Sequence, residues 1–317
     1  MAARTRAVRI SRFGGPEVLE VVHVARPEPP PGGVVLEVRA AGVNPVDTKV
    51  RRGLRDTGPL TAPIGLGSDA AGVVVAVDPG ATRWAIGDQV IARGLTGAYA
   101  THVAAGPDNL ARKPAALGFA QGAAIGVPAG TAYQVLRSVK LTEGELLLVH
   151  AGSGGVGQAA IQFARLWGAT VVATASPVNH DRIRELGATP VAYGPGLTDR
   201  LRAVAPDGFD ASLDAAGTDE ALHACLALTR DPERIATVVA VEQAKTLGIR
   251  GFSGSRAGWL SAEERGWRAE ALQVTADLAR QGRFSIEISV SYPLDAVAAA
   301  HRHSETTHVR GKIVLVP

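Results

Sequence analysis

The sequence contains a single cysteine, Cys225, and this scarcity limits the chemistry open to the chain. One thiol cannot form an intramolecular disulfide, and it cannot supply a four-cysteine structural zinc site. Any metal site would have to be built mainly from His, Asp or Glu side chains. We therefore expect a protein of the reducing cytoplasm that holds no metal ion.

Long apolar runs and a strong charge imbalance are also absent. No segment has the roughly 18 consecutive apolar residues that a membrane helix needs, and residues 1–15 lack the apolar core of a signal peptide. The chain has 33 basic and 30 acidic residues, a formal charge of +3, with no long block of either sign. We therefore expect a soluble protein that binds neither membranes nor nucleic acid.

The most informative segment that is present is a glycine-rich turn after an apolar strand. Residues 146–150 read Leu-Leu-Leu-Val-His, and the pattern Gly-x-Gly-x-x-Gly then leads into a helical stretch at 156–167. In this context the pattern indicates a dinucleotide site. Gly152 would permit the tight turn, Gly154 the approach of backbone N–H groups to a pyrophosphate, and Gly157 close packing of helix on strand. The alternative is a turn that binds nothing. The predicted cofactor-binding residues here are Gly152, Ser153, Gly154, Gly155, Val156 and Gly157.

The end of the second strand lacks the carboxylate by which NAD-binding domains hold the ribose 2′-hydroxyl. After the strand at 169–176 come Pro-Val-Asn-His, and the first acid is Asp181. Hydroxyls, amides and cations such as Arg182 can accommodate a 2′-phosphate when no carboxylate repels it. The sequence therefore predicts NADPH in preference to NADH, although Arg182 and Arg184 could simply be solvated surface charges.

The distribution of strand and helix patterns predicts two domains. The first third is rich in short strands between Pro and Gly clusters. From about Phe119, strands near 146–150, 170–175, 190–193, 209–214, 234–240 and 249–252 alternate with helices, as in a doubly wound parallel sheet. The tail reads as helix 262–281, extended 286–291, a helix from Leu294 and a strand at 312–316. We expect residues 1–118 and 258–317 to form a discontinuous β-rich catalytic domain, and residues 119–257 to form the nucleotide domain.

Several segments occur in the order found in the medium-chain dehydrogenase/reductase superfamily, which the chain resembles over nearly its whole length. These segments are Ala40–Lys49, Gly67–Val74, Gly87–Val90, Gly130–Tyr133, Ala151–Gly157 and Val309–Val314. The chain is most similar to the zinc-free, NADPH-dependent quinone oxidoreductases, the zeta-crystallin-like branch. The resemblance implies an α/β protein with a Rossmann domain and a GroES-like catalytic domain.

The choice of this branch depends on two positions at which zinc-dependent relatives carry ligands. Here they are Asn44 and Ser68, and neither is a good zinc ligand. Without a Lewis acid, alcohol oxidation loses its usual activating group, whereas hydride transfer to an electron-poor acceptor remains feasible. Quinones and α,β-unsaturated carbonyls are acceptors of that kind.

The resemblance also implies three catalytic residues. Asn44 matches an amide near the nicotinamide and substrate, and Thr131 matches a threonine against the nicotinamide. The alternatives are a turn residue before Pro45 and a helix N-cap, respectively. Lys49 lies in the active-site segment, where it would stabilise an oxygen anion if it points into the cleft. Otherwise Asp47, Lys49 and Arg51 are charges on a solvated short helix.

For the 2′-phosphate, the resemblance points to the ends of the second and third strands. Tyr193 matches a family tyrosine, with packing at a strand end as the alternative. Asn179 replaces a lysine of some relatives, which would weaken phosphate binding unless Arg182 or His180 compensates. We add the hydroxyl of Ser176 to this predicted group.

The histidines do not form an evident metal site. His301, His303 and His308 are expected to be a surface cluster, and His150 either lines the cofactor crevice or is a satisfied residue at a strand end.

We thus expect an NADPH-dependent, metal-independent oxidoreductase that transfers hydride to a quinone or a related electron-poor carbonyl acceptor. The alternatives are an enone or enoyl-thioester reductase and a non-catalytic NADPH-binding protein that interacts with RNA. The loops 51–61 and 251–259 would set specificity, and the resemblance implies a homodimer formed through the sheet edge at 237–241 and 247–252.

Overall fold

The computed structural model describes residues 4–55, 58–254 and 258–317. The chain divides into two compact units, residues 1–127 with 272–317 and residues 128–271. The boundaries expected from the sequence, 118/119 and 257/258, fall earlier in the chain than the edges of these units. Within the described residues no helix is long and apolar enough to cross a membrane.

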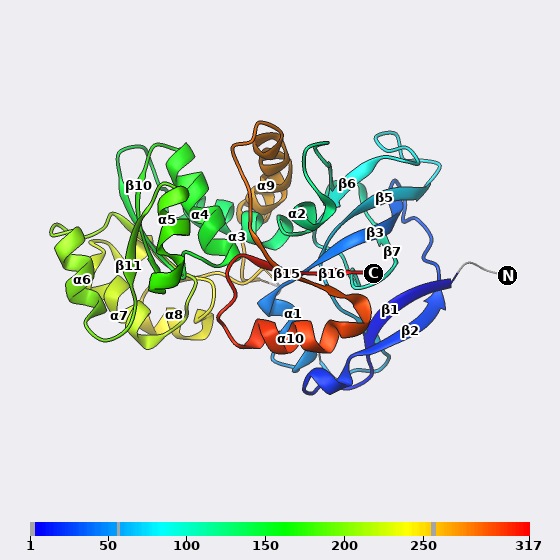
Figure 1. Cartoon of the computed structure of the whole chain (residues 1–317), viewed down its shortest axis with the longest axis horizontal. Helices are drawn as coiled ribbons and strands as arrows, with labels where there is room; N and C mark the ends of the chain where they lie inside the picture. The colour runs from blue at the N-terminus through cyan, green and yellow to red at the C-terminus, as the bar shows by residue number, and fades with distance from the viewer. Residues whose placement is uncertain (1–3, 56–57, 255–257) are drawn as a thin grey trace. The chain divides into compact units, whose positions relative to one another are not determined.

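The first unit is built on two β-sheets (Figure 1). The larger sheet contains β15 (Ile288–Pro293), β16 (Lys312–Val316), β3 (Val34–Val43), β5 (Asp69–Val77), β6 (Gln89–Ala92) and β8 (Leu110–Arg112) in that order, with β7 (His102–Ala105) also paired to β3. The smaller sheet has the order β2 (Glu20–Ala25), β1 (Arg4–Ile10), β4 (Ile64–Gly65). The helices are η1 (Pro16–Val18), α1 (Pro45–Arg51), η2 (Pro107–Asn109), α2 (Phe119–Ala123), η5 (Leu294–Ala296) and α10 (Val297–Glu305).

Alternating apolar side chains hold the larger sheet together. Val34, Leu36 and Val38 of β3 are buried in one cluster with Ile313 and Leu315 of β16. The two strands pair antiparallel, with Ile313 opposite Val43. This register places Lys312, the residue before Ile313, at the end of β3, where the candidate site residue Asn44 follows.

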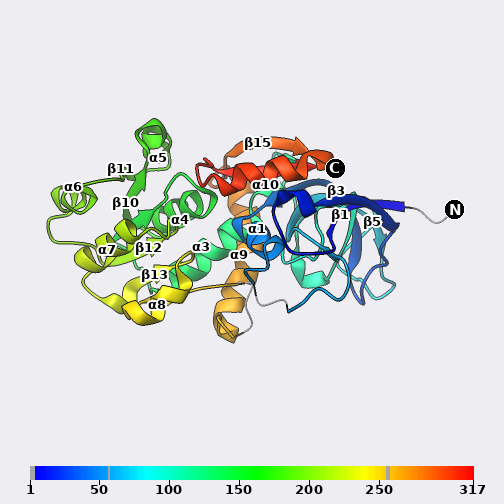
Figure 2. The same ribbon diagram turned by 90° about the horizontal axis from the view of Figure 1, so that it is seen from below.

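The second unit contains the expected parallel sheet, with the strand order of a Rossmann fold. The order is β11 (Thr189–Ala192), β10 (Thr170–Ala175), β9 (Leu146–His150), β12 (Ala211–Asp214), β13 (Ile235–Thr237) and β14 (Arg250–Gly251). The helices are α3 (Gly126–Ser138), α4 (Gly155–Leu166), η3 (Pro177–Asn179), α5 (His180–Glu185), α6 (Leu197–Val204), α7 (Asp219–Leu228), η4 (Pro232–Arg234), α8 (Val241–Leu247) and α9 (Ala262–Arg280). The two boundaries in sequence between the units fall within α3 and α9. Figure 2 shows the helices of this unit around its sheet.

The central strands are buried on both faces, which explains their continuous apolar sequences. β9 and β10 have the bounds expected from sequence. The expected strand 234–240 is wrong in its second half, because the chain turns after Thr237. The Thr237 hydroxyl accepts hydrogen bonds from Val239 N–H (3.3 Å) and Ala240 N–H (3.1 Å), and this turn leads directly into α8.

Candidate functional site

The glycine turn joins β9 to α4 at the carboxyl edge of the parallel sheet. Gly154 is the N-cap residue of α4, and no side chain among the described residues caps it. The first helical hydrogen bond runs from Gln158 N–H to the carbonyl oxygen of Gly154, at 2.8 Å. The N–H groups of residues 155–157 therefore precede the helical ladder and are oriented towards the helix N-terminus. Such a terminus favours an anion.

Two glycines of the turn, Gly154 and Gly157, differ in the space around them. A Cβ atom on Gly157 would lie 2.3 Å from the carbonyl oxygen of Ala151 and 2.6 Å from Cα of Gly152. A Cβ on Gly154 would meet only the Ala151 oxygen, at 3.5 Å. Gly157 is therefore required by packing, whereas Gly154 leaves open space on the outer side of the turn.

An amide and two hydroxyls lie together between the turn and the end of β10. Asn179 Nδ2 donates to Ser176 Oγ at 3.0 Å and to Ser153 Oγ at 3.3 Å. Because each hydroxyl accepts from Asn179, its own hydrogen remains able to donate to a further acceptor. Three residues expected from the sequence are thus brought into one group of hydrogen-bond donors.

Tyr193 follows the neighbouring strand β11, and Arg182 lies in α5, the helix that begins directly after Asn179. Ala175 of β10 pairs with Ala192 of β11, so the next residues, Ser176 and Tyr193, emerge at the same sheet edge. The Tyr193 side chain is 50% exposed. Arg182 donates to Gln158 Oε1 of α4 at 3.4 Å and pairs with Glu185 at 3.2 Å.

In the first unit, Asn44 lies between two buried groups of opposite charge. It directly precedes Pro45 as the N-cap residue of α1, and its side chain is only 1% exposed. Asn44 Nδ2 donates to Asp69 Oδ2 at 3.0 Å, and Asn44 Oδ1 accepts a hydrogen bond from the Lys312 ammonium. The same Asp69 oxygen accepts from Val127 N–H at 2.9 Å. These bonds fix the orientation of the Asn44 carboxamide.

A second buried carboxylate, Asp47, adjoins this group. Asp47 Oδ2 accepts from Asn44 N–H at 2.8 Å and from the Tyr99 hydroxyl at 2.7 Å. Burial raises the pKa of Asp47 to about 6, against the lowering effect of these bonds and of Lys312. Burial also raises the pKa of Asp69 and lowers that of Lys312. The first unit therefore contains an ionisable network within its core.

The alternative interpretation of Asp47, Lys49 and Arg51 as charges on a solvated short helix is wrong for two of them. Asp47 is buried, and Arg51 is 1% exposed. Arg51 donates to the carbonyl oxygen of Gly14 at 3.1 Å, contacts His301 Nδ1 at 3.3 Å and pairs with Glu305 at 2.5 Å. Lys49 lies in the same helix and is partly buried.

Thr131 does not occupy a helix terminus, so its interpretation as an N-cap is wrong. α3 begins at Gly126, and Thr131 is a buried residue within the helix. The expected surface cluster of histidines is also wrong in part. His301 is fully buried beside Arg51, and burial together with that cation lowers its pKa to about 3. His303 contacts the Tyr292 hydroxyl at 3.2 Å, and His308 is exposed.

His150 ends β9 as a buried imidazole. Its Nδ1 lies 3.0 Å from Thr174 Oγ1. Burial lowers its pKa to about 4, and the opposing charges of Asp214 and Glu220 only partly compensate. Asp214, the register partner of His150, accepts from Ala216 N–H (2.9 Å), Gly217 N–H (2.8 Å) and the Thr237 hydroxyl (2.7 Å).

From the lowered pKa of His150 we predict that part of the free energy of unfolding is lost in acid. The pKa of His150 rises from about 4 in the folded state to 6.5 on unfolding. The stabilisation is therefore present above pH 6.5 and lost as the pH falls through 4, by about 3 kcal/mol. We expect urea unfolding between pH 7 and pH 4 to show a larger loss for the wild type than for His150→Gln, by about this amount. Equal losses in both proteins would contradict the prediction.

The residues present do not fit a zinc ion at the positions of Asn44 and Ser68. The Asn44 oxygen already accepts a hydrogen bond from a cation, Lys312. Across residues 4–55, 58–254 and 258–317, no group of three or more His, Cys, Asp or Glu side chains could hold a metal ion. The donor set at this position is therefore unsuitable for zinc.

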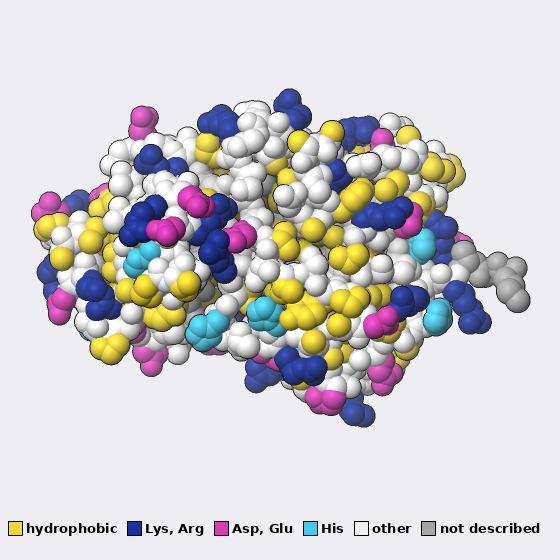
Figure 3. Space-filling model, viewed as in Figure 1, with side chains coloured by type: hydrophobic (Ala, Val, Ile, Leu, Met, Phe, Trp, Pro, Cys, Tyr) yellow, Lys and Arg dark blue, Asp and Glu magenta, His cyan; other side chains and the backbone are white. Residues whose placement is uncertain are grey.

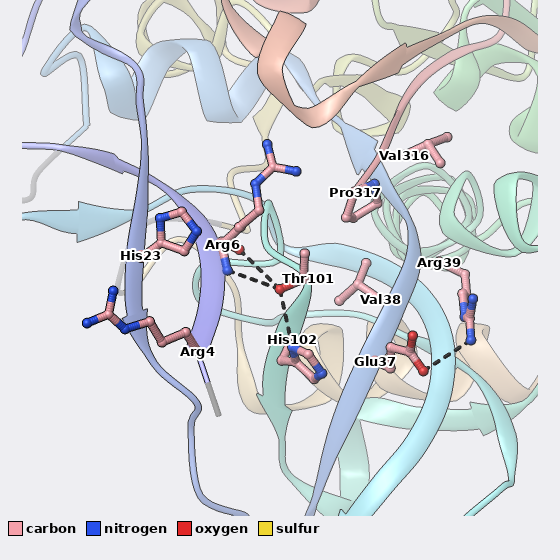
Figure 4. A pocket seen from close by; sticks show the side chains of 10 residues that line it. All are labelled: Arg4, Arg6, His23, Glu37, Val38, Arg39, Thr101, His102, Val316 and Pro317. Atoms are coloured by element: carbon pink, nitrogen blue, oxygen red, sulfur yellow. Dashed lines mark hydrogen bonds and ion pairs between the residues drawn. The ribbon is translucent and has the colours of Figure 1, made fainter. Parts of the chain in front are cut away.

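The first unit contains a hollow of about 690 Å³ (Figure 4). Its lining includes Arg4, Arg6, His23, Glu37, Arg39 and His102. Arg39 pairs with Glu37 at 3.1 Å, and Arg6 pairs with Asp295. None of the expected site residues lines this hollow, and pairing offsets much of its positive charge. On the face shown in Figure 3, basic and acidic side chains are likewise interspersed.

Reasoning from the sequence missed several members of the buried network. Asp69 and Lys312 lie inside the segments Gly67–Val74 and Val309–Val314, so their presence in recognisable motifs was an available signal. Tyr99 had no comparable signal, and neither did Asp214, the register partner of His150 in the second unit. The expected specificity loops, 51–61 and 251–259, include residues 56–57 and 255–257, which lie outside the described residues.

Comparisons with known proteins agree with this architecture. Residues 30–141 match the family model for the alcohol dehydrogenase GroES-like domain, and residues 186–315 match the model named zinc-binding dehydrogenase. The quinone oxidoreductase of Homo sapiens is 34% identical, over 98% of this chain and 97% of the relative.

Two solved structures are similar over almost the whole chain. The quinone oxidoreductase from Coxiella burnetii has 31% identity and a TM-score of 0.83, covering 99% of this chain and 100% of that one. A mycobacterial protein complexed with NADPH has 28% identity and a TM-score of 0.82, with the same coverage. With its GroES-like unit, its Rossmann sheet and full-length similarity to quinone oxidoreductases, the chain belongs to the medium-chain dehydrogenase/reductase superfamily.

Proposed function

We propose that this protein is an NADPH-dependent oxidoreductase that transfers hydride to a quinone or a related electron-poor carbonyl compound without a metal ion. One observation carries the proposal: an uncapped helix N-terminus after the glycine turn adjoins a group of neutral donors, Ser153, Ser176 and Asn179. No carboxylate stands at the end of β10 to repel a 2′-phosphate. The similarity to quinone oxidoreductases, and to a protein complexed with NADPH, supports the same function.

The coenzyme would be held by backbone and side-chain donors of the second unit. N–H groups at the start of α4 would bind the pyrophosphate. The hydroxyls of Ser153 and Ser176, with Asn179, Arg182 and Tyr193, would bind the 2′-phosphate. When bound, the reduced nicotinamide supplies hydride chemistry, and the protein contributes position and electrostatics.

The proposed catalytic residues are Asn44, Thr131 and Lys49. The bonds of Asn44 to Asp69 and Lys312 hold its carboxamide in one orientation, which is a requirement for precise positioning. We propose that Lys49 stabilises the oxygen anion formed on the acceptor after it receives hydride. Solvent water then supplies the proton.

The test is an acceptor panel in the presence of a metal chelator. NADPH oxidation is followed with a quinone, an enone and an enoyl thioester, and each reaction is repeated with NADH. We expect turnover with the quinone and a clear preference for NADPH, unaffected by the chelator. Turnover confined to the enone or thioester would favour the reductase alternative, and coenzyme binding without turnover would favour a binding protein. A better rate with NADH, or loss of activity with the chelator, would overturn the proposal.

A substitution at Asn179 tests the proposed phosphate site. Asn179→Lys places an ammonium beside the two serine hydroxyls, so we expect the preference for NADPH over NADH to rise about tenfold. The control is Val178→Lys, which adds the same charge at the neighbouring, largely exposed position. An equal rise in both variants would indicate a general field effect, and no rise in Asn179→Lys would place the phosphate elsewhere.

We also propose a homodimer formed through the edge of the parallel sheet. β14 is the last strand on one side of that sheet. Its backbone is therefore placed to pair with the same strand of a second copy.

A further inference from the structure

The loop after β11 carries Tyr193 and is held by charged side chains of two helices. The name Tyr193 loop is used for residues 192–196, which include Ala192, the last residue of β11. Two of its glycines have left-handed backbone conformations, Gly194 at φ 100° and Gly196 at φ 81°. Tyr193 is half exposed, and it follows Ala192, whose register partner Ala175 directly precedes Ser176. A loop with such exposed backbone would ordinarily be mobile.

Arg200 of α6 binds three carbonyl groups of this loop. Its Nε donates to the carbonyl oxygen of Ala192 at 3.0 Å, and its two terminal nitrogens donate to the oxygens of Gly194 (2.7 Å) and Pro195 (2.8 Å). A planar guanidinium with several donors is suited to this, because one rigid group can fix several acceptors. All three nitrogens of the guanidinium thus donate to carbonyl groups of the loop backbone.

Glu220, in the first turn of α7, holds the loop from the other helix. Its Oε2 accepts a hydrogen bond from Gly194 N–H at 2.9 Å. Gly194 is therefore bound through both its N–H and its carbonyl group by side chains of opposite charge. The main chain directly after Tyr193 is fixed on both sides.

We propose that Arg200 and Glu220 are positioning residues that hold the Tyr193 loop in place and thereby set the preference for a 2′-phosphorylated coenzyme. This inference rests on the proposed function, in which Tyr193 binds the 2′-phosphate. Neither residue contacts the phosphate. Both act by reducing the conformational entropy that the loop would lose on binding.

The experiment measures dissociation constants of NADPH and NADH, and of 2′,5′-ADP and 5′-AMP, for wild type, Arg200→Ala and Glu220→Ala. For Arg200→Ala we expect about a tenfold loss for NADPH and 2′,5′-ADP, with NADH and 5′-AMP nearly unchanged. Glu220→Ala should show a smaller loss of the same kind. Glu220→Gln keeps an acceptor for Gly194 N–H and should restore the wild-type preference.

The matched control is Arg202→Ala on the same helix, which removes an exposed ion pair with Asp199. It should leave all four constants unchanged. Tyr193→Phe should lower the preference for NADPH in the wild type, but not further in Arg200→Ala. If Arg200→Ala does not fold, Arg200→Lys, which cannot bind three carbonyls in one plane, takes its place.

Two failures are distinguishable. A wild type that prefers NADPH, with an Arg200 variant that keeps this preference or loses affinity for both coenzymes equally, overturns the positioning role alone. A wild type that binds neither coenzyme overturns the proposed function and this inference with it.

Discussion

Gly157→Ala is expected to lower affinity for the coenzyme at least about 100-fold and to destabilise the protein by about 1–3 kcal/mol. The added Cβ would lie 2.3 Å from the Ala151 oxygen and 2.6 Å from Gly152 Cα, distances that force the helix away from the turn. The N–H groups at the start of α4 would move with it. Coenzyme titration and urea unfolding measure the two effects.

Substitutions at two other glycines distinguish the effect on packing from the effect on coenzyme binding. Gly154→Ala has room for its methyl group, so its loss of stability should be limited to the cost of alanine at an N-cap position, about 1 kcal/mol or less, and it should still weaken coenzyme binding, because the methyl group adds bulk at the turn where the ligand approaches. Gly266→Ala is the control: no atom lies within 4 Å of its added Cβ, and alanine favours the helix. Coenzyme binding by Gly157→Ala at wild-type strength would contradict the placement of the ligand at this turn.

Lys312→Met is expected to cost about 3–5 kcal/mol of stability near pH 8, because it leaves the buried carboxylates Asp47 and Asp69 without this cation. The loss should be smaller at pH 5. Asp47 has a pKa of about 6 in the folded protein and can be protonated there at little cost, which removes one of the uncompensated charges. Urea unfolding at the two pH values measures the difference.

A double substitution tests whether charge is the cause. Asp69→Asn added to Lys312→Met should recover a large part of the lost stability, because it removes one unpaired charge. Lys245→Met, at an exposed position of α8, should change stability by less than about 0.5 kcal/mol. An equal loss for Lys312→Met at pH 5 and pH 8, with no recovery in the double variant, would show that packing alone is affected.

The Rossmann unit could be predicted well because its signals are local. The apolar strand 146–150, the glycines and the helix that follows are contiguous in sequence, and their geometry follows from short-range sterics. The predicted strand 234–240 is too long because Val238 and Val239 have strand-like side chains, whereas the Thr237 hydroxyl accepts hydrogen bonds from the N–H groups of Val239 and Ala240. The strand propensity of side chains does not predict a turn that is formed by a hydrogen bond from the backbone to a hydroxyl.

The buried network in the first unit could not be predicted in the same way. Asn44, Asp69 and Lys312 are brought together by the pairing of β3 with β5 and β16, over separations that periodicity cannot detect. Arg51 resembled a surface charge because an alternating pattern normally indicates a solvated face. Its partners Gly14 and His301 come from distant segments. Long-range contacts of this kind decide which polar residues are buried.

The pairing of β16 with β3 has a consequence for synthesis on the ribosome. β3 emerges early in translation, but β16, its neighbour on one side, follows only after the whole second unit has been made. During that interval the nascent N-terminal segment contains Asp47 and Asp69 without Lys312. Burial of the two carboxylates is then not compensated by this cation. The edge of β3 that pairs with β16 stays unpaired until the last strand has been made.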